Sequence, residues 1–433
     1  MKRDKTQKLW SKAKKIIPGG NMMLSKKPDL FLPEKWPAYF SKTKGCKVWD
    51  LDGREYIDLS IMGVGTNILG YNNIEVDEAV KKTIRKGNMS TLNCPEEVYL
   101  TEKLLRMHPW ADMAKFTRSG GEANAVAVRI ARAAAKNVNI AVCGYHGWHD
   151  WYLAANIGNN SNLNKHLLKG LNTLGVPKQL KKTVFPFNYN NLDELEKIIK
   201  TKKIGIIKME VSRNFEPNNN FLKKVRDIAN KRKIILIFDE CTSGFRQTFG
   251  GLHKYYKVEP DLAIFGKAMG NGCAINAVIG KKKVMKFASQ TFISSTFWTE
   301  RIGPTAALKT LEVMKRIKSW ETITSKGKII LKEWNKLSKK YNLQIIYSGI
   351  PALARFEIKS KNFIKYKTLI TQEFLKENIL ASNMIYFSVE HSNKVLKMYL
   401  EILDKVFKKI EECENGRKIE DFLSNKVSFN SFE

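Results

Sequence analysis

Short apolar runs alternate with amphipathic helical patterns through the middle of this chain. The apolar runs are bounded by Gly, Asp or Lys and cover residues 139–144, 203–210, 233–240 and 261–266. Helical spacing of apolar residues is clearest in segments 75–86, 96–107 and 122–136. Apolar runs between helices are typical of strands buried on both faces, as in parallel sheets covered by helices. We therefore expect an α/β domain built on a mostly parallel sheet.

Two further regions flank this central part. Near the start, residues 47–60 contain two alternating runs about Asp52-Gly53, a pattern that predicts a β-hairpin. Near the end, strand-like runs and amphipathic helices follow one another over residues 345–412. We expect three parts: an N-terminal segment (1–60), a large domain (61–310) and a smaller α+β domain (311–433).

The charge balance limits the partners that such a chain would bind. Its 433 residues include 75 Lys and Arg against 42 Asp and Glu, a net charge of +33. Most basic residues are lysines dispersed through amphipathic helices without a nucleic-acid-binding motif, so we expect no nucleic-acid partner. No apolar run approaches the roughly 18 residues of a membrane span, and none resembles a secretory signal. The six scattered cysteines contain no CxxC pair, so we expect no metal and a reducing, cytoplasmic location.

Two of the predicted strands end in ionisable side chains, at the edge where open α/β sheets bind ligands. The run 233–240 ends in Asp239, which in isolation is equally consistent with a turn or a helix cap. Lys267 follows the run 261–266 among Gly, Ala and Met. Lost solvation there favours a neutral, nucleophilic amine, although a surface lysine is the commoner outcome for one such residue. The separation of 28 positions (267 − 239) leaves room for one helix and a crossover.

Two more segments contain groups suited to an anion and to a flat ring. Ser119-Gly120-Gly121 joins a short strand to a long helix, and free N–H groups at a glycine-rich helix start bind phosphate. This turn is neither a Walker loop nor a GxGxxG fingerprint. The segment after the run 139–144 contains an aromatic cluster: Tyr145, His146, Trp148 and His149. Such a cluster stacks on a planar group or packs in the core, and two histidines without a third ligand do not favour a metal.

An acid, an amine nucleophile, an anion cradle and an aromatic platform at successive strand ends together fit one cofactor. A planar, cationic, phosphorylated aldehyde uses all four groups, and pyridoxal 5'-phosphate is such a molecule. The lysine would bind its aldehyde as a Schiff base, the aspartate would keep the ring nitrogen protonated, and the helix start would hold the phosphate.

The segments that contain these residues resemble the class III aminotransferases of pyridoxal-phosphate fold type I, and among them the group around glutamate-1-semialdehyde 2,1-aminomutase. The matching stretches follow the family's order over most of residues 18–310: PGG, VWDLDGREYIDL, FTRSGGEANAVAVRIARA, YHGWHD, ILIFDECTSGFR, PDLAIFGKAMGNGCAINAVIG and SSTFWTERIGPTAAL. The resemblance implies a large, mostly parallel-sheet domain and a smaller α+β C-terminal domain. It also implies that the N-terminal segment contributes to the small domain and to the substrate site.

The resemblance assigns roles to individual positions. It implies that Lys267 binds the cofactor and moves the proton, that Asp239 pairs with the ring nitrogen, and that Tyr145 stacks on the ring. Further cofactor-binding residues are implied at Ser119, Gly120, Gly121, His146, Glu210, Asn214 and Thr296. Thr296 resembles the residue that reaches the phosphate from the partner subunit, which implies a homodimer with shared active sites.

The stretches that would hold the cofactor and the substrate depart from the family at several positions. KMEVSRN, around Glu210 and Asn214, has unusual spacing, and the phosphate turn reads Ser-Gly-Gly-Glu where Ser-Gly-Thr-Glu is frequent. The aminomutase has YHGH where this chain has YHGW. It also has an arginine for the substrate carboxylate where this chain offers only Lys26 and Lys27.

We therefore predict a ping-pong aminotransferase that moves an amino group between a small-molecule amino donor and an aldehyde or ketone acceptor. An intramolecular 2,1-aminomutase of the glutamate-1-semialdehyde type is the alternative. An amino-acid racemase or epimerase on the same scaffold is a third.

Overall fold

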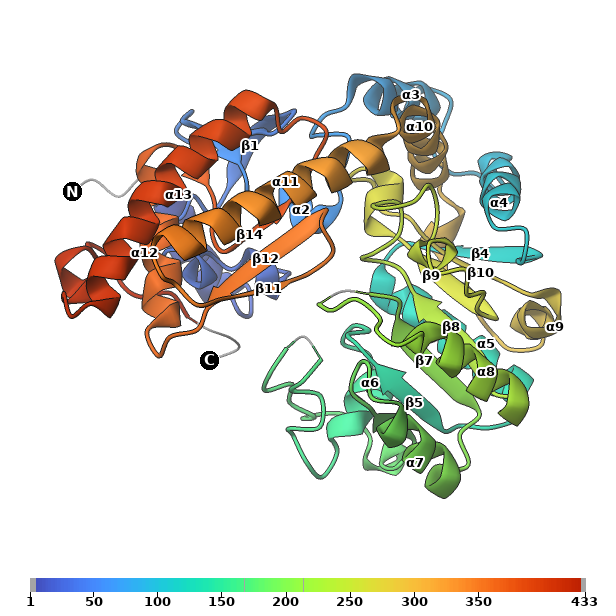
Figure 1. Ribbon diagram of the computed structural model, residues 1–433. Helices are drawn as coiled ribbons and strands as arrows, with labels where there is room; N and C mark the ends of the chain where they lie inside the picture. Colours follow the sequence, from blue (N-terminus) through green and yellow to red (C-terminus); the bar gives the residue numbers. More distant parts are fainter. Residues whose placement is uncertain (1–4, 167, 213, 430–433) are drawn as a thin grey trace. The chain divides into compact units, whose positions relative to one another are not determined.

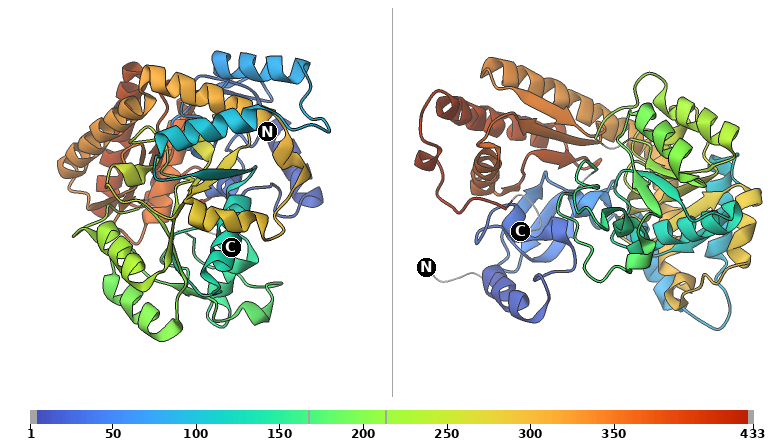
Figure 2. Two further views of the ribbon diagram at one scale, coloured as in Figure 1. Left: turned by 90° about the vertical axis from the view of Figure 1, so that its right-hand side faces the viewer. Right: turned by 90° about the horizontal axis from the view of Figure 1, so that it is seen from below.

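The computed structural model describes residues 5–166, 168–212 and 214–429, and the chain divides into two compact units (Figures 1 and 2). One unit comprises Met1–Asn73 with Thr322–Glu433, and the other comprises Ile74–Glu321. This division lies later in the sequence than the expected domain limits at residues 60 and 310, which stay a prediction. Among the described residues, no helix is both long and apolar enough to cross a membrane.

A seven-stranded sheet forms the centre of the unit Ile74–Glu321, in the order β4-β10-β9-β8-β7-β5-β6. Its strands are β4 (Met113–Thr117), β5 (Ile140–Cys143), β6 (Val184–Pro186), β7 (Ile206–Glu210), β8 (Ile235–Asp239), β9 (Leu262–Phe265) and β10 (Asn276–Gly280). The strands from β9 to β6 pair in parallel, whereas β10 is antiparallel to both β9 and β4. The four apolar runs became β5, β7, β8 and β9, which confirms the mostly parallel sheet.

Helices pack on this sheet and bury its apolar side chains. Helix α5 (Gly120–Ala135) contacts β4 and the strands β7 to β10, and it shares a core with alternate strand residues such as Ile206 and Ile237. Helices α7 (Leu192–Lys202) and α8 (Phe221–Arg232) contact each other and the strands β5 and β8, respectively (Figure 1). The other α-helices are α3 (Ile74–Arg85), α4 (Glu96–Met107), α6 (Asp150–Leu153), α9 (Lys282–Met285) and α10 (Ile302–Ile317).

Short 3₁₀ helices occupy several loops of this unit: η3 (Ala154–Asn156), η4 (Lys178–Leu180), η5 (Leu252–Lys254), η6 (Lys267–Gly270), η7 (Lys286–Ser289) and η8 (Thr296–Thr299). The predicted helices at 75–86, 96–107 and 122–136 are α3, α4 and α5. The connection from β8 to β9 contains η5 instead of the α-helix for which its length leaves room.

The other unit contains two smaller sheets, with strand orders β1-β2-β3-β13 and β11-β12-β14. Their strands are β1 (Phe40–Lys44), β2 (Lys47–Asp50), β3 (Glu55–Asp58), β11 (Ile345–Ser348), β12 (Leu353–Ile358), β13 (Ile379–Leu380) and β14 (Met384–Tyr386). The antiparallel pair β2 and β3 is the predicted hairpin. The helices are α1 (Lys5–Ile16), α2 (Met62–Gly65), most of α11 (Ser319–Lys340), α12 (Phe363–Lys376) and α13 (Asn393–Glu414), with η1 (Leu24–Lys26), η2 (Pro28–Leu30) and η9 (Ile419–Asp421).

Candidate active site

Parallel pairing brings three of the predicted residues to one edge of the large sheet. Strand β7 ends at Glu210 and β8 ends at Asp239, and these two residues are register partners. Strand β9 pairs with β8 on its other side, and Lys267 follows β9 after the single residue Gly266. The three side chains therefore come from the carboxyl ends of neighbouring strands, where α/β sheets bind ligands.

Asp239 is an almost fully buried carboxylate, 4% exposed. Its Oδ2 lies 2.8 Å from His146 Nδ1 and 3.9 Å from Lys208 Nζ, and its Oδ1 accepts the N–H of Cys241 at 3.1 Å. Burial alone would raise the pKa of this carboxyl. The Lys208 ammonium and the hydrogen bonds from His146 and Cys241 instead hold the pKa of Asp239 below its usual value. Asp239 is therefore ionised at neutral pH.

His146 contributes to the site through Asp239. Its Nδ1 bonds to the carboxylate, and its buried Nε2 has no hydrogen-bond partner among the described residues. Burial, together with the nearby charge of Lys208, lowers the pKa of His146 despite the opposing effect of Asp239. The ring is thus neutral, and it must carry its proton on Nδ1 to donate to the carboxylate.

Lys267 occupies the first position of η6 in a constrained backbone conformation. Its φ of 39° lies in the left-handed region, which costs a non-glycine residue on the order of 1 kcal/mol. The preceding Gly266 has no room for a side chain, because a Cβ there would lie 1.8 Å from Asn276 Oδ1. The Lys267 Nζ donates to Thr242 Oγ1 at 2.6 Å. Sequence reasoning missed Thr242, and its only signal was a hydroxyl three positions after Asp239.

The start of α5 is closed by a capping box. Ser119 Oγ accepts the N–H of Glu122 at 3.3 Å, and the Glu122 carboxylate accepts the N–H of Ser119 at 2.8 Å. As at any helix start, the first-turn N–H groups, which include those of Gly120 and Gly121, have no intrahelical acceptor. Gly121 is also required by packing, because a Cβ there would lie 2.6 Å from the ring of His149. The Ser119 side chain and its N–H thus serve the helix, and the N–H groups of Gly120 and Gly121 are the ones suited to bind an anion.

Glu210 and Asn214 line the same small cavity, of about 40 Å³. Glu210 Oε2 accepts the N–H of Tyr145 at 3.0 Å, and Asn214 Nδ2 donates to the carbonyl of His166 at 3.3 Å. Gly144, with a φ of 106°, passes so close to Glu210 that a Cβ would lie 2.6 Å from Oε2. Glu210 therefore fixes the backbone of the segment that carries Tyr145 and His146.

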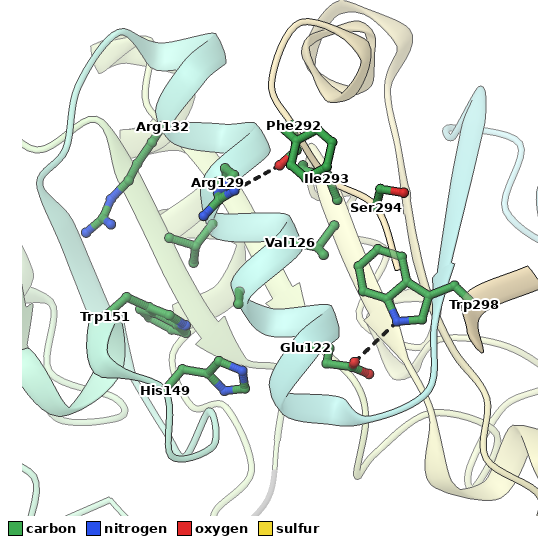
Figure 3. A pocket seen from close by; sticks show the side chains of 12 residues that line it. Glu122, Val126, Arg129, Arg132, His149, Trp151, Phe292, Ile293, Ser294 and Trp298 are labelled. Atoms are coloured by element: carbon green, nitrogen blue, oxygen red, sulfur yellow. Dashed lines mark hydrogen bonds between the residues drawn. The ribbon is translucent and has the colours of Figure 1, made fainter. Parts of the chain in front are cut away.

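Thr296 lies outside this strand-end group, exposed at the first position of η8. The loop before and within η8 is attached to α5 by two hydrogen bonds (Figure 3). Arg129 donates to the carbonyl of Phe292 at 2.9 Å, and Trp298 Nε1 donates to Glu122 at 3.2 Å. Residues of the loop and the helix line an open hollow of about 470 Å³.

The strand-end residues fit the chemical groups of pyridoxal phosphate. The Asp239 carboxylate accepts two hydrogen bonds, from His146 and Cys241, and so has lone pairs left for a protonated ring nitrogen. The half-buried Lys267 supplies an amine for an aldehyde, and the start of α5 supplies N–H donors for a phosphate.

Comparison with known proteins agrees with this chemistry. The aminotransferase class-III family matches residues 33–387. A 3-aminobutyryl-CoA aminotransferase of Cloacimonas acidaminovorans is 32% identical over 418 residues, which cover 93% of this chain and 96% of that protein. A glutamate-1-semialdehyde 2,1-aminomutase of Sulfurisphaera tokodaii is 30% identical over 429 residues, which cover 94% of this chain and 100% of that protein.

Solved structures share the fold. The pyridoxal-phosphate form of the FumI protein of Sphingopyxis sp. MTA144 superposes with a TM-score of 0.85 at 23% identity, covering 98% of each chain. An omega-transaminase of Sphaerobacter thermophilus has a TM-score of 0.81 at 21% identity, covering 95% of this chain and 98% of that one. The predicted fold type I is confirmed.

The match to the family extends over most of the chain, so the resemblance seen in the sequence is confirmed, together with the predictions of an enzyme and of its cofactor. The chain belongs to the class-III aminotransferase family and is a pyridoxal-phosphate-dependent aminotransferase.

Proposed function

We propose that the cofactor binds covalently to Lys267 and that its ring nitrogen pairs with Asp239. The observation that carries this proposal is the ionised Asp239 at the end of β8, next to the strand that leads into Lys267. The enzyme moves an amino group from a donor to an aldehyde or ketone acceptor in two half-reactions.

When bound, pyridoxal phosphate supplies an aldehyde carbon and a ring that withdraws electrons from the Cα of the amino substrate. Asp239 keeps the ring nitrogen protonated, which strengthens that withdrawal. Lys267 Nζ takes the proton from the donor Cα and later returns a proton, acting as base and then as acid. The Thr242 hydroxyl accepts a hydrogen bond from Nζ and so orients the amine for both transfers.

The remaining predicted residues position the cofactor. The backbone N–H groups of Gly120 and Gly121 would hold the phosphate beside Ser119, whose own N–H is bonded to Glu122, and the Tyr145 ring would stack on the cofactor ring. His146 orients Asp239 through the hydrogen bond to Oδ2. Glu210 and Asn214 would lie beside the cofactor, and Glu210 fixes the backbone at Tyr145.

Borohydride reduction followed by peptide mass spectrometry tests the attachment site. Reduction makes the bond between cofactor and lysine permanent, so the cofactor mass should appear on the peptide that contains Lys267. The Lys267→Ala protein should carry no such mass and should transfer no amino group. Cofactor mass on another lysine of the wild-type protein would refute the assignment.

The amino donor is proposed from the relatives. The protein that is 32% identical is named for 3-aminobutyryl-CoA, whose amino group lies on the β carbon, so β-amino acids and their thioesters are the first donors to test. The aminomutase is kept as a second candidate because a 30% identical relative over its full length has that name. A single half-reaction separates the two: an aminotransferase releases one equivalent of carbonyl product from its donor, whereas a mutase releases none.

We further propose a homodimer, in which a second copy covers the surface around Thr296 and Thr296 reaches the partner's phosphate site. Three large aromatic side chains are exposed in the segments near α5: Phe292 (84%), Phe297 (69%) and Trp148 (72%). Phe297→Glu should shift the sedimentation coefficient toward that of a monomer. Phe429→Glu, a matched change at another exposed phenylalanine, should leave the dimer intact.

A cytoplasmic location and the absence of a nucleic-acid partner also belong to this proposal. All six cysteines are free thiols, which is typical of a reducing compartment. The basic residues are dispersed through helices, so we expect no salt-dependent binding to DNA or RNA.

A further inference from the structure

A lysine side chain lies inside the apolar core under the large sheet. Lys208 is the third residue of β7 and is 0% exposed. Because side chains alternate along a strand, Lys208 points to the same face as Ile206 and Glu210. Ile206 belongs to the core shared with α5, so the lysine stem lies in that core. A fully buried lysine is rare unless it is paired.

The Lys208 ammonium is directed at Asp239. Its Nζ lies 3.9 Å from Asp239 Oδ2, the oxygen that also bonds His146. It lies 5.9 Å from the centre of the Trp151 ring, within range of a cation–π contact. Among the described residues, Lys208 Nζ has no hydrogen-bond acceptor. Asp239 is therefore the group that this charge serves.

Packing alone does not account for a lysine at this position. Replacing a buried ion pair with apolar residues of similar volume is often neutral or stabilising, so an isoleucine or methionine would fill this space at lower cost. The same face of the sheet carries two carboxylates at its edge, Asp239 and its register partner Glu210. The Lys208 ammonium on this face reduces the repulsion between these two neighbouring carboxylates.

We propose that Lys208 is a positioning residue that acts through Asp239. Its ammonium keeps the carboxylate ionised and in place before the cofactor binds. Once the cofactor is bound, the ammonium partly offsets the negative charge of Asp239. The ring nitrogen then holds its proton less tightly than it would beside Asp239 alone. This inference rests on the proposed pairing of Asp239 with the ring nitrogen.

The charged groups around Lys208 agree with this role. Burial lowers the pKa of Lys208, and the negative charges of Asp239 and, less strongly, of Glu210 oppose that effect. Lys208 in turn lowers the pKa of His146 and of Asp239. The ammonium therefore favours a neutral His146 and an ionised Asp239, which is the arrangement that leaves a lone pair for the ring nitrogen.

The ring nitrogen of the bound cofactor gives the first test. With ¹⁵N-labelled pyridoxal phosphate, Lys208→Met should raise the titration midpoint of the ring nitrogen by about one pH unit, because the carboxylate no longer shares its charge. Ile206→Met changes the same face of β7 without changing charge, and it should leave the midpoint where it is in the wild type. An unchanged midpoint in Lys208→Met would overturn the inference.

Thermal unfolding of the cofactor-free protein gives an independent test. Lys208→Met leaves Asp239 buried without its cation and should lower the melting temperature. Adding Asp239→Asn removes the orphaned charge, so the double variant should be more stable than Lys208→Met. If Lys208→Met has the same effect in the wild type as in the Asp239→Asn variant, the lysine only fills space and the inference is overturned.

Two outcomes separate this inference from the proposed function. If Asp239→Asn leaves the ring nitrogen unchanged, the pairing of Asp239 with the cofactor is wrong, and the inference falls with it. If the ring nitrogen responds to Asp239→Asn but not to Lys208→Met, the inference alone is overturned. Should Lys208→Met not fold, a folded double variant supports the inference. A double variant that fails while Asp239→Asn folds refutes it.

Discussion

Asp239 and Glu240 are adjacent, buried carboxylates at the end of β8. They differ in the number of hydrogen bonds that they accept. Glu240 accepts four hydrogen bonds. Its Oε1 receives the backbone N–H of His253 at 3.0 Å and His253 Nδ1–H at 2.5 Å, and its Oε2 receives the backbone N–H of Leu252 at 2.5 Å and the Ser243 hydroxyl at 3.1 Å. Asp239 receives two, from His146 and Cys241, with Lys208 farther away.

The residues that bond to Glu240, and the loop they belong to, have further hydrogen-bond partners of their own. His253 Nε2 accepts the indole N–H of Trp110 at 2.9 Å, and His108 Nε2 accepts the N–H of Gly251 at 3.0 Å. The network holds the η5 loop, and all the lone pairs of Glu240 are used. The number of donors, and not burial, therefore distinguishes the acid that stabilises the loop from the acid that is left with acceptor capacity for a ligand.

The largest expected effect comes from the acid with spare acceptor capacity. Asp239→Asn removes the charge that holds a proton on the ring nitrogen, so kcat should fall by about 10³-fold, or about 4 kcal/mol in the barrier. Single-turnover amino transfer by cofactor-loaded protein measures the change. Glu240→Gln serves as the control and should stay within about threefold of the wild type per folded molecule. Similar losses in both variants would remove the distinction between the two acids.

Glu240→Gln should instead reduce stability. In the variant, the amide NH₂ group would face N–H or O–H donors that bond to a carboxylate oxygen in the wild type. The free energy of unfolding should fall by about 3 kcal/mol, which lowers the melting temperature by about 6–12 °C. Circular dichroism during heating measures the shift. Glu259→Gln, at an exposed position in the same connection, should shift the melting temperature by less than about 1 °C.

The free energy of unfolding should also fall in acid, because His108 belongs to the hydrogen-bond network around Glu240. Burial, partly offset by the hydrogen bond to the Leu104 carbonyl, lowers the pKa of His108 to about 4. The unfolded chain therefore binds the proton first, and stability that is present above about pH 6.5 is lost as the pH falls toward 4. His108 should account for about 2 kcal/mol of the stability lost between pH 7 and pH 5.

Urea unfolding at both pH values, for the wild type and for His108→Gln, isolates this contribution. The glutamine has no proton to gain in this range, so the variant should lose correspondingly less stability than the wild type. Equal losses in the two proteins would place the acid sensitivity in other buried groups, such as His391, whose pKa burial also lowers to about 4.

The large sheet and the positions of Asp239 and Lys267 at its edge were predictable because their signals are local. Strands β5, β7, β8 and β9 are short apolar runs, and Asp239 and Lys267 stand at the ends of two of them. The different environments of Asp239 and Glu240 were not predictable, because they depend on donors that come from residues 243–253 through a loop without periodic pattern. The same loop occupies the stretch between Asp239 and Lys267, where the spacing leaves room for an α-helix.

Lys208 and Thr242 escaped prediction for a different reason. Lys208 lies within a run that is otherwise read as an apolar strand, and a strand pattern does not tell whether one lysine reaches an edge or a carboxylate. Thr242 is one of several hydroxyls after β8, and only the folded turn brings it to Lys267. The roles assigned to all the site residues stay predictions, because they depend on a bound cofactor and, for Thr296, also on a partner subunit.

The smallest expected effect compares two threonines of the connection that follows β8. Thr242 Oγ1 accepts from Lys267 Nζ, whereas Thr248 Oγ1 donates to the carbonyl of Gly251 at 2.8 Å, in the loop that Glu240 holds. Each side chain can be replaced by the similarly shaped valine. Thr242→Val should lower kcat about three- to tenfold, because one hydrogen bond to the amine contributes about 1 kcal/mol to its orientation. Thr248→Val should leave kcat unchanged and lower the melting temperature by about 2–4 °C. If both valine variants lower kcat by the same factor, the hydroxyl of Thr242 does not orient the Lys267 amine. Thr242 would then belong with the residues around Glu240 that only stabilise the loop.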